Sequence, residues 1–85
     1  MRHLADAQFW AAYDRLPSHV QKAADESFSL LKSDPRHPSL QFKKVGRFVS
    51  ARVGRHYRAV AVQRGSDVVW IWIGLHDMYE RKIQF

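Results

Sequence analysis

His76 is the side chain in this sequence best suited to move a proton near neutral pH. It follows the most apolar stretch of the chain, residues 68–75, and precedes Asp77-Met78-Tyr79. An imidazole at the end of an expected strand can reach a cleft and exchange a proton close to pH 7. Tyr79 is a second candidate for chemistry in the same segment. The alternative is structural: His76 caps the closing turn and Tyr79 packs on the core.

Arg52 and Arg58 are the second group of residues that could act on a substrate. A guanidinium stays protonated, so it cannot serve as a base, but it can bind a phosphate and stabilise charge that develops there. If Val53 pairs with Tyr57 across a three-residue turn, the two arginines face each other on one side of a sheet. Facing arginines repel each other, and an anion between them would remove that penalty. We therefore expect both to project into an open, phosphate-sized recess near His76.

The positive charge of the chain is concentrated in its middle. The 85 residues carry a formal net charge of +6, but no acidic residue lies between residues 35 and 66, where eight lysines and arginines fall. Such segregation favours binding to a nucleic acid or another acidic partner, the alternative being a solvated basic surface that keeps the protein soluble. The residues expected to contact a nucleic acid are Lys43, Lys44, Arg47, Arg55 and Arg81.

Four aromatic residues, Phe48, Tyr57, Trp70 and Trp72, interleave with the arginines along the chain. Aromatic rings beside arginines can stack on unpaired bases. The same rings also suit a hydrophobic core, and the sequence leaves both uses open.

No metal or cofactor is expected. The chain has no cysteine, which excludes thiolate ligands and thiol nucleophiles. The histidines lack a spacing that would bring two of them to one metal, and no glycine-rich phosphate loop or nucleophile elbow is present. No apolar run approaches the ~20 residues of a membrane span, and no secretory signal is recognisable, so we expect a cytoplasmic protein without a membrane partner.

Two helices are expected before the proline at position 35. Asp6 can cap a first helix that runs to about residue 15. Ser18 and Gln21 have the spacing of a capping box for a second helix of about fifteen residues, which the proline ends because the residue before it leaves the helical region. The short link between the helices predicts a tight helical hairpin.

The rest of the chain has the composition and alternation of β-strands. Short turns between the strands predict an antiparallel sheet. Ala51, Ala59 and Ala61 alternate to the side opposite the arginines, where small residues let helices approach closely. The expected strands cover residues 42–45, 48–53, 57–63 and 68–73, and a last helical turn covers residues 78–83.

The fold class predicted from these elements is α+β within a single domain over residues 1–85. An N-terminal αα-hairpin packs on a twisted antiparallel sheet of three or four strands, and a short helical turn closes the chain. Four apolar residues lie on the arginine side of this sheet, where either the closing segment or a partner protein would cover them: Val60, Val62, Val69 and Ile71.

Taken in order, these segments resemble the RelE/ParE superfamily of bacterial type II toxins. The resemblance rests on a basic strand, the pattern Gly-x-x-Tyr-Arg at residues 54–58, and the closing Ile-Gly-x-His-Asp-x-Tyr at residues 73–79. It extends over roughly residues 17–85. Members usually open with a β-strand before the first helix, and here at most residues 2–5 can supply one.

The resemblance also implies a function. RelE-like members cut messenger RNA on the ribosome without a metal, by attack of a ribose 2′-hydroxyl on the adjacent phosphate, and a cognate antitoxin protein neutralises them. Carried over by position, Arg58 matches the arginine that holds the phosphate, and Arg52 matches a basic strand residue near it. His76 would act as the general acid or base, with Tyr79 as the second candidate for that role.

Two other functions stay open at this point. ParE-like members inhibit DNA gyrase and are not nucleases, whereas an attenuated, solitary homologue would bind nucleic acid without toxicity. The partners to be expected are therefore an antitoxin together with either ribosome-bound messenger RNA or gyrase.

Overall fold

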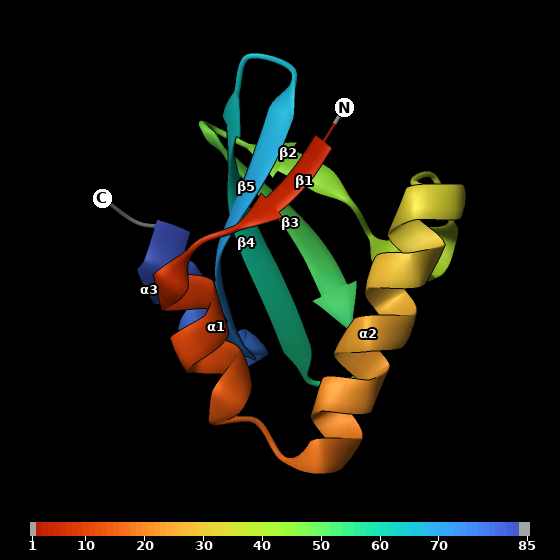
Figure 1. Cartoon of the computed structure of the whole chain (residues 1–85), viewed down its shortest axis with the longest axis vertical. Coiled ribbons are helices and arrows are strands. Elements are labelled where there is room, and N and C mark those ends of the chain that lie inside the picture. Colours follow the sequence, from red (N-terminus) through yellow and green to blue (C-terminus); the bar gives the residue numbers. More distant parts are fainter. Residues whose placement is uncertain (1, 84–85) are drawn as a thin grey trace.

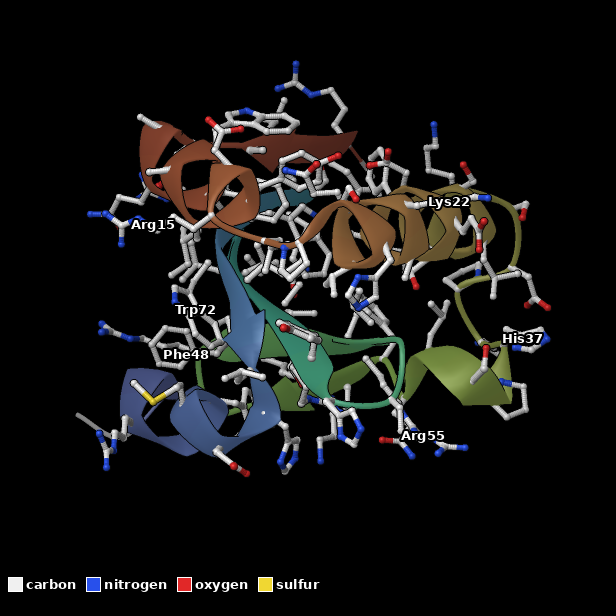
Figure 2. The ribbon with its side chains drawn as sticks, turned by 90° about the horizontal axis from the view of Figure 1, so that it is seen from below. Arg15, Lys22, His37, Phe48, Arg55 and Trp72 are labelled. Carbon is white, nitrogen blue, oxygen red and sulfur yellow. The ribbon has the colours of Figure 1, made fainter. Side chains whose placement is uncertain are left out.

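The computed structural model describes residues 2–83, and the side chains of these residues except 80, 82 and 83. Figure 2 shows two helices on one side of a sheet and a third helix on the other, so the fold is α+β as expected. The elements are β1 (Arg2–Ala5), α1 (Ala7–Asp14), α2 (Ser18–Ser33), a 3₁₀ turn (Pro38–Leu40), β2 (Lys43–Val45), β3 (Phe48–Val53), β4 (Tyr57–Arg64), β5 (Asp67–Leu75) and α3 (His76–Ile83).

The sheet has five strands in the order β1-β5-β4-β3-β2. The strands from β2 to β5 pair antiparallel, as the short turns between them require. The expected count of three or four strands is wrong because β1 adds a fifth strand, parallel to β5, from Arg2 opposite Asp67 to Ala5 opposite Trp70. The two helices and three further strands between β1 and β5 form the long connection that a parallel pair needs.

The helices α1 and α2 have the expected extents but different caps. Asp6 caps α1 by accepting a hydrogen bond from the backbone N–H of Phe9 at 2.9 Å. The capping box expected for α2 is wrong: Pro17 is the N-cap, and Gln21 instead donates its side-chain N–H to the carbonyl of Tyr13 at 3.0 Å. Figure 1 shows the two helices diverging from their short loop, so the hairpin is more open than expected. No helix in the described part is long and apolar enough to span a membrane.

An apolar cavity of about 410 Å³ lies between α1, α2 and the sheet. Trp10 and Phe28 line it and are exposed. His3 also lines it, with its imidazole stacked on Trp70 and its Nδ1 accepting a hydrogen bond from the indole N–H at 3.2 Å. Burial lowers the pKa of His3, and the positive charge of Lys32 acts in the same direction.

The larger hydrophobic core lies between the sheet and these two helices. Ala51, Ala59 and Ala61 face it, as the alternation in β3 and β4 predicts. Ala61 has no exposed surface, so its small side chain leaves room for bulkier residues around it, among them Leu31 of α2. The helix side of the sheet is therefore a conventional apolar interior.

A second, smaller cluster lies on the opposite side of the sheet, where α3 packs. It consists of Phe48, Val60 and Tyr79, with Trp72 among the partly buried residues around it. Val60 has no exposed surface, so the closing segment covers it, whereas Val62, Val69 and Ile71 are half-buried. The closing segment is also longer than expected, because α3 begins at His76, directly after β5.

Candidate functional site

Arg52 and Arg58 lie next to each other on neighbouring strands. Val53 pairs with Tyr57 and Arg52 pairs with Arg58, so the register expected for this hairpin is confirmed. The residue that continues this row on β5 is Gly74, and the indole of Trp72 lies over it.

Arg58 is almost inaccessible, with 3% of its surface exposed. Its guanidinium donates three hydrogen bonds, from Nη1 to Gln41 Oε1 at 3.2 Å, from Nη2 to the backbone carbonyl of Gln41 at 3.2 Å, and from Nη2 to Ser50 Oγ at 2.9 Å. The Nε–H has no partner among the described residues. Burial lowers the pKa of Arg58, whereas the interaction with Tyr79 acts in the opposite direction, and the like charge of Arg52 lowers the pKa further. The open recess expected from the sequence is therefore wrong for Arg58.

Tyr79 covers the buried guanidinium. The centre of its ring lies 5.0 Å from the Arg58 guanidinium carbon, and its hydroxyl donates a hydrogen bond to Ser50 Oγ at 3.2 Å. The imidazole of His76 stacks on the same ring, with the two ring centres 5.8 Å apart and the planes at 28°. Tyr79 thus packs on the core, whereas His76 is exposed at the first position of α3. The three residues form one continuous set of contacts from solvent to Arg58.

Arg52 faces a different space from Arg58. Its Nε–H donates to the backbone carbonyl of Gly54 at 2.9 Å. With Arg55, it lines a hollow of about 480 Å³ beside α2, whose wall also includes Ser39 and Glu26. The two arginines therefore share one row of the sheet but do not share a recess.

The basic residues expected to contact a nucleic acid lie at the periphery. Arg47 is in the turn between β2 and β3, with its guanidinium carbon 5.1 Å from the centre of the Phe48 ring. Arg55 is in the turn between β3 and β4, where it lines the hollow beside α2. Their contacts with RNA stay a prediction. The five residues of this group, all exposed, are Lys43, Lys44, Arg47, Arg55 and Arg81.

Packing decides between the two uses of the aromatic residues. Trp70 and Phe48 are buried, one in each core. Tyr57 packs against the helix-side core and Trp72 against the cluster under α3. All four rings therefore contribute to the cores, whereas the imidazole of His76 is exposed.

Of the other histidines, His56 adjoins this set of contacts, because its backbone carbonyl accepts a hydrogen bond from the N–H of His76 at 2.7 Å. His3 is at the apolar cavity, and His37 accepts hydrogen bonds through its Nδ1 from the N–H of Ser39. In the described part of the chain, no three histidine, aspartate or glutamate side chains gather as ligands for one metal ion. What this surface offers chemically is an imidazole that can exchange protons, a phenol and a guanidinium in contact.

Comparison with known proteins relies on structure. No family model matches the sequence, and no curated protein matches it. The RelE chain of a RelB–RelE antitoxin–toxin complex from Methanococcus jannaschii superimposes with a TM-score of 0.72 at 15% identity, over 95% of this chain and 99% of that one. The chain has the RelE/ParE fold. Two further solved structures have the same fold. A YoeB/ParE toxin from Agrobacterium tumefaciens superimposes with a TM-score of 0.68 at 16% identity, over 89% of this chain and 99% of that one. YafQ from Escherichia coli superimposes with a TM-score of 0.68 at 12% identity, over 93% of this chain and 98% of that one.

The structure decides whether a β-strand precedes the first helix, which the sequence did not settle. Residues 2–5 form β1, so the chain has the opening strand that members of the superfamily usually possess. This strand lies at the edge of the sheet, beside β5, and leads directly into the Asp6 cap of α1.

The sequence did not predict that Ser50 and Gln41 hold Arg58. Ser50 had a signal, since it lies two positions before Arg52 and therefore on the same side of β3. Gln41 had none: it adopts a left-handed backbone conformation, with φ of 43°, and this allows both its side chain and its carbonyl to reach Arg58.

Proposed function

We propose that this protein is the toxin of a type II toxin–antitoxin pair and cleaves messenger RNA on the ribosome, in the cytoplasm. The RelE/ParE fold supports the proposal, because solved proteins of this fold are described as RelE, YoeB and YafQ toxins. The observation that carries it is the contact of His76 and Arg58 with the same ring of Tyr79. An exposed proton-exchanging group and a phosphate-binding group are thereby joined next to a basic surface.

The proposed reaction is attack of a ribose 2′-hydroxyl on the adjacent phosphorus. The 2′-oxygen loses its proton to a base and forms the new P–O bond, while the bond from phosphorus to the 5′-oxygen breaks and that oxygen takes up a proton. His76 is the candidate for one of these proton transfers, with Tyr79 as the second candidate. Arg58 would stabilise the negative charge that develops on the five-coordinate phosphorus. The same role for Arg52, which lines a separate hollow, stays a prediction.

An antitoxin is the proposed partner. The M. jannaschii structure is a complex of antitoxin and toxin, and so is one of the E. coli structures of the same fold. We expect a small protein encoded beside this one to bind it tightly and to abolish its effect on growth. Lys43, Lys44, Arg47, Arg55 and Arg81 would contact the RNA or the ribosome.

A translating extract tests the proposed activity. Purified protein is added to it, and breaks in ribosome-bound messenger are mapped by primer extension. We expect cleavage with the wild type, and loss of cleavage with His76→Ala and Arg58→Ala while both variants remain folded by circular dichroism. Arg15→Ala, a change of an exposed arginine after α1, is the matched control and should cleave normally.

Gyrase inhibition is the second candidate function, and one observation favours it. Arg58 is covered in this structure, which suits a protein that binds without cleaving. A supercoiling assay with purified gyrase discriminates between the two. Inhibition of supercoiling with intact messenger would replace the nuclease proposal, and absence of growth arrest on expression would argue against both.

A further inference from the structure

Exposed apolar side chains gather around the cavity between α1, α2 and the sheet. Among the described residues, five large apolar side chains are exposed, and three of them, Leu4, Trp10 and Phe28, line this cavity. Helix α1 reads Ala-Gln-Phe-Trp-Ala-Ala-Tyr-Asp, yet none of its residues is buried. A helix that is apolar on most of its surface is normally covered, and exposed apolar patches often mark a binding site. This surface therefore has the composition of a binding site.

The cavity has the size and the lining of a site for a small molecule. Its volume of about 410 Å³ falls within the ~300–1,000 Å³ of such sites, which are mostly apolar with a few polar groups. Ala51 and Ala59 of the sheet line it beside the buried ring of Trp70, and their small side chains leave the space open. A stable contact between two proteins needs about 800 Å² on each partner, so a compact cavity favours a small ligand.

Asp25 gives the cavity a negative charge. It is the charged residue among the described ones that line the cavity once the neutral state of the imidazole there is taken into account. The hydroxyl of Tyr13 donates a hydrogen bond to Asp25 Oδ1 at 2.9 Å, which holds the carboxylate beside the aromatic residues of α1. A cationic group in the cavity would therefore meet an opposite charge.

The imidazole at the cavity is that of His3, and it does not oppose a cation. Its Nδ1 accepts the hydrogen bond from Trp70, so this nitrogen carries no proton and the ring is neutral. Lys32, a nearby cation, does not line the cavity, and its ammonium lies 4.8 Å from the centre of the Phe28 ring. The charge at the cavity wall is therefore negative, although the whole chain has a formal charge of +6.

Phe9, Trp10 and Tyr13 form an aromatic wall near Asp25. The ring centre of Trp10 lies 5.2 Å from that of Phe9 and 5.4 Å from that of Tyr13, with the planes at 81° and 79°. Trp10 is 51% exposed, so part of its ring is accessible to a ligand. The face of an aromatic ring attracts a cation, and tryptophan does so most strongly.

We propose that this cavity binds a small organic ammonium compound, whose cationic nitrogen contacts Asp25 and Trp10 and whose apolar body lies against Trp70. The site is on the side of the sheet opposite α3 (Figure 2), and it is therefore separate from the residues proposed for cleavage. Non-specific attraction to a basic protein favours anions, so a preference for a cation would identify this site.

Three compounds that share a phenyl ring test the preference. The full chain, labelled with nitrogen-15, is titrated at about pH 7.5 with 2-phenylethylamine, which is protonated there, with 2-phenylethanol and with 3-phenylpropionate. We expect the amine to shift amide signals of α1, α2 and β1 with a dissociation constant of about 1 mM or lower. Because Asp25 is exposed, the alcohol should bind about two- to fivefold more weakly, and the carboxylate should bind most weakly.

Two variants locate the ligand. Asp25→Asn should remove the preference for the amine over the alcohol, whereas Glu26→Gln, the next residue of α2 and no part of the cavity wall, should keep it. Trp10→Ala should weaken binding of the amine by about fivefold or more. Met78→Ala, at an exposed position on α3, should leave binding unchanged. Circular dichroism confirms that each variant remains folded.

Several outcomes overturn the proposal. One is the absence of saturable shifts up to about 10 mM amine, and another is a carboxylate that binds as tightly as the amine. A full preference for the amine in Asp25→Asn would also contradict it. If sedimentation velocity shows a dimer that Trp10→Ala dissociates, the surface is an interface between two copies of the chain. Protection of the α1 amides from hydrogen exchange by a partner protein, with no amine binding to the free chain, would assign the surface to that partner.

Discussion

The two sides of the sheet are made from the same strands and are built in different ways. On the side of α1 and α2, alanines alternate along β3 and β4 and meet large apolar residues such as Leu31 and Trp70. On the side of α3, the alternate positions of the same strands carry Ser50 and Arg58, with Tyr79 packed over them. The first side gains free energy from buried apolar surface, whereas the second buries a charge at a cost. The burial of a charge on one side only is in line with the proposed function of the α3 side.

The largest loss of stability should come from the helix side. Leu31 of α2 is 3% exposed, and Leu31→Ala leaves a cavity in the main core. We expect the free energy of unfolding to fall by about 2–5 kcal/mol. For a domain of this size that corresponds to a drop in melting temperature of about 10 °C or more. Thermal unfolding followed by circular dichroism measures it.

Leu75→Ala is the matched control for that change. Leu75 is 47% exposed at the end of β5, so its truncation should cost far less. Equal losses in the two variants would contradict the view that the helix side supplies most of the stability.

A smaller loss is expected from Gly74 on the α3 side. The indole of Trp72 lies over this glycine, and a Cβ added there would be 2.4 Å from Trp72 Cζ2. Gly74→Ala should therefore push the indole away and cost about 1–3 kcal/mol. In a Trp72→Leu background the clash disappears, so the same change should cost much less. A double-mutant cycle in urea measures the difference, and additive effects would show that the indole is not the cause.

The main elements were predictable from the sequence because their signals are local. The hairpin that places Arg52 opposite Arg58 follows from a three-residue turn, and the alanine side follows from the two-residue period of strands. Asp6 was recognisable as a cap because its carboxylate acts three residues away, on Phe9.

The contacts that were missed are set by tertiary packing. The parallel pairing of β1 with β5 joins residues more than sixty positions apart, and four residues give little sequence signal. The burial of Arg58 depends on Gln41 and Tyr79, which reach it from a loop and from α3. Alternation along the strand predicts the side of the sheet on which Arg58 lies. It does not predict that Tyr79 covers the guanidinium.

The stability of the fold should depend on pH through His3, which lies at the helix-side cavity. Because burial lowers its pKa in the folded state, the unfolded chain binds more protons just below neutral pH, and stability falls as the pH falls. Protonation also removes the Nδ1 acceptor of the Trp70 N–H, a bond worth about 0.5–1.5 kcal/mol. Melting temperatures at about pH 7.5 and 5.5 should differ less in His3→Gln than in the wild type. His19→Gln, at an exposed position of α2, should behave like the wild type, and an unchanged pH dependence in His3→Gln would exclude His3 as the cause.

The smallest change in stability, and the one most informative about the α3 side, is expected for Arg58→Met. Methionine keeps much of the length of the side chain and removes a buried charge that has no counter-ion among the described residues. The cost of dehydration therefore disappears along with three hydrogen bonds to neutral acceptors. We expect a free energy of unfolding within about 1 kcal/mol of the wild type, or higher. Arg55→Met, at an exposed turn, is the control for loss of one positive charge. A loss as large as that of Leu31→Ala would show that Arg58 holds the fold together, and the contrast between a stabilising side and a functional side would then fail. A stable Arg58→Met protein that no longer binds RNA would place the function of the sheet on the side that contributes least to its stability.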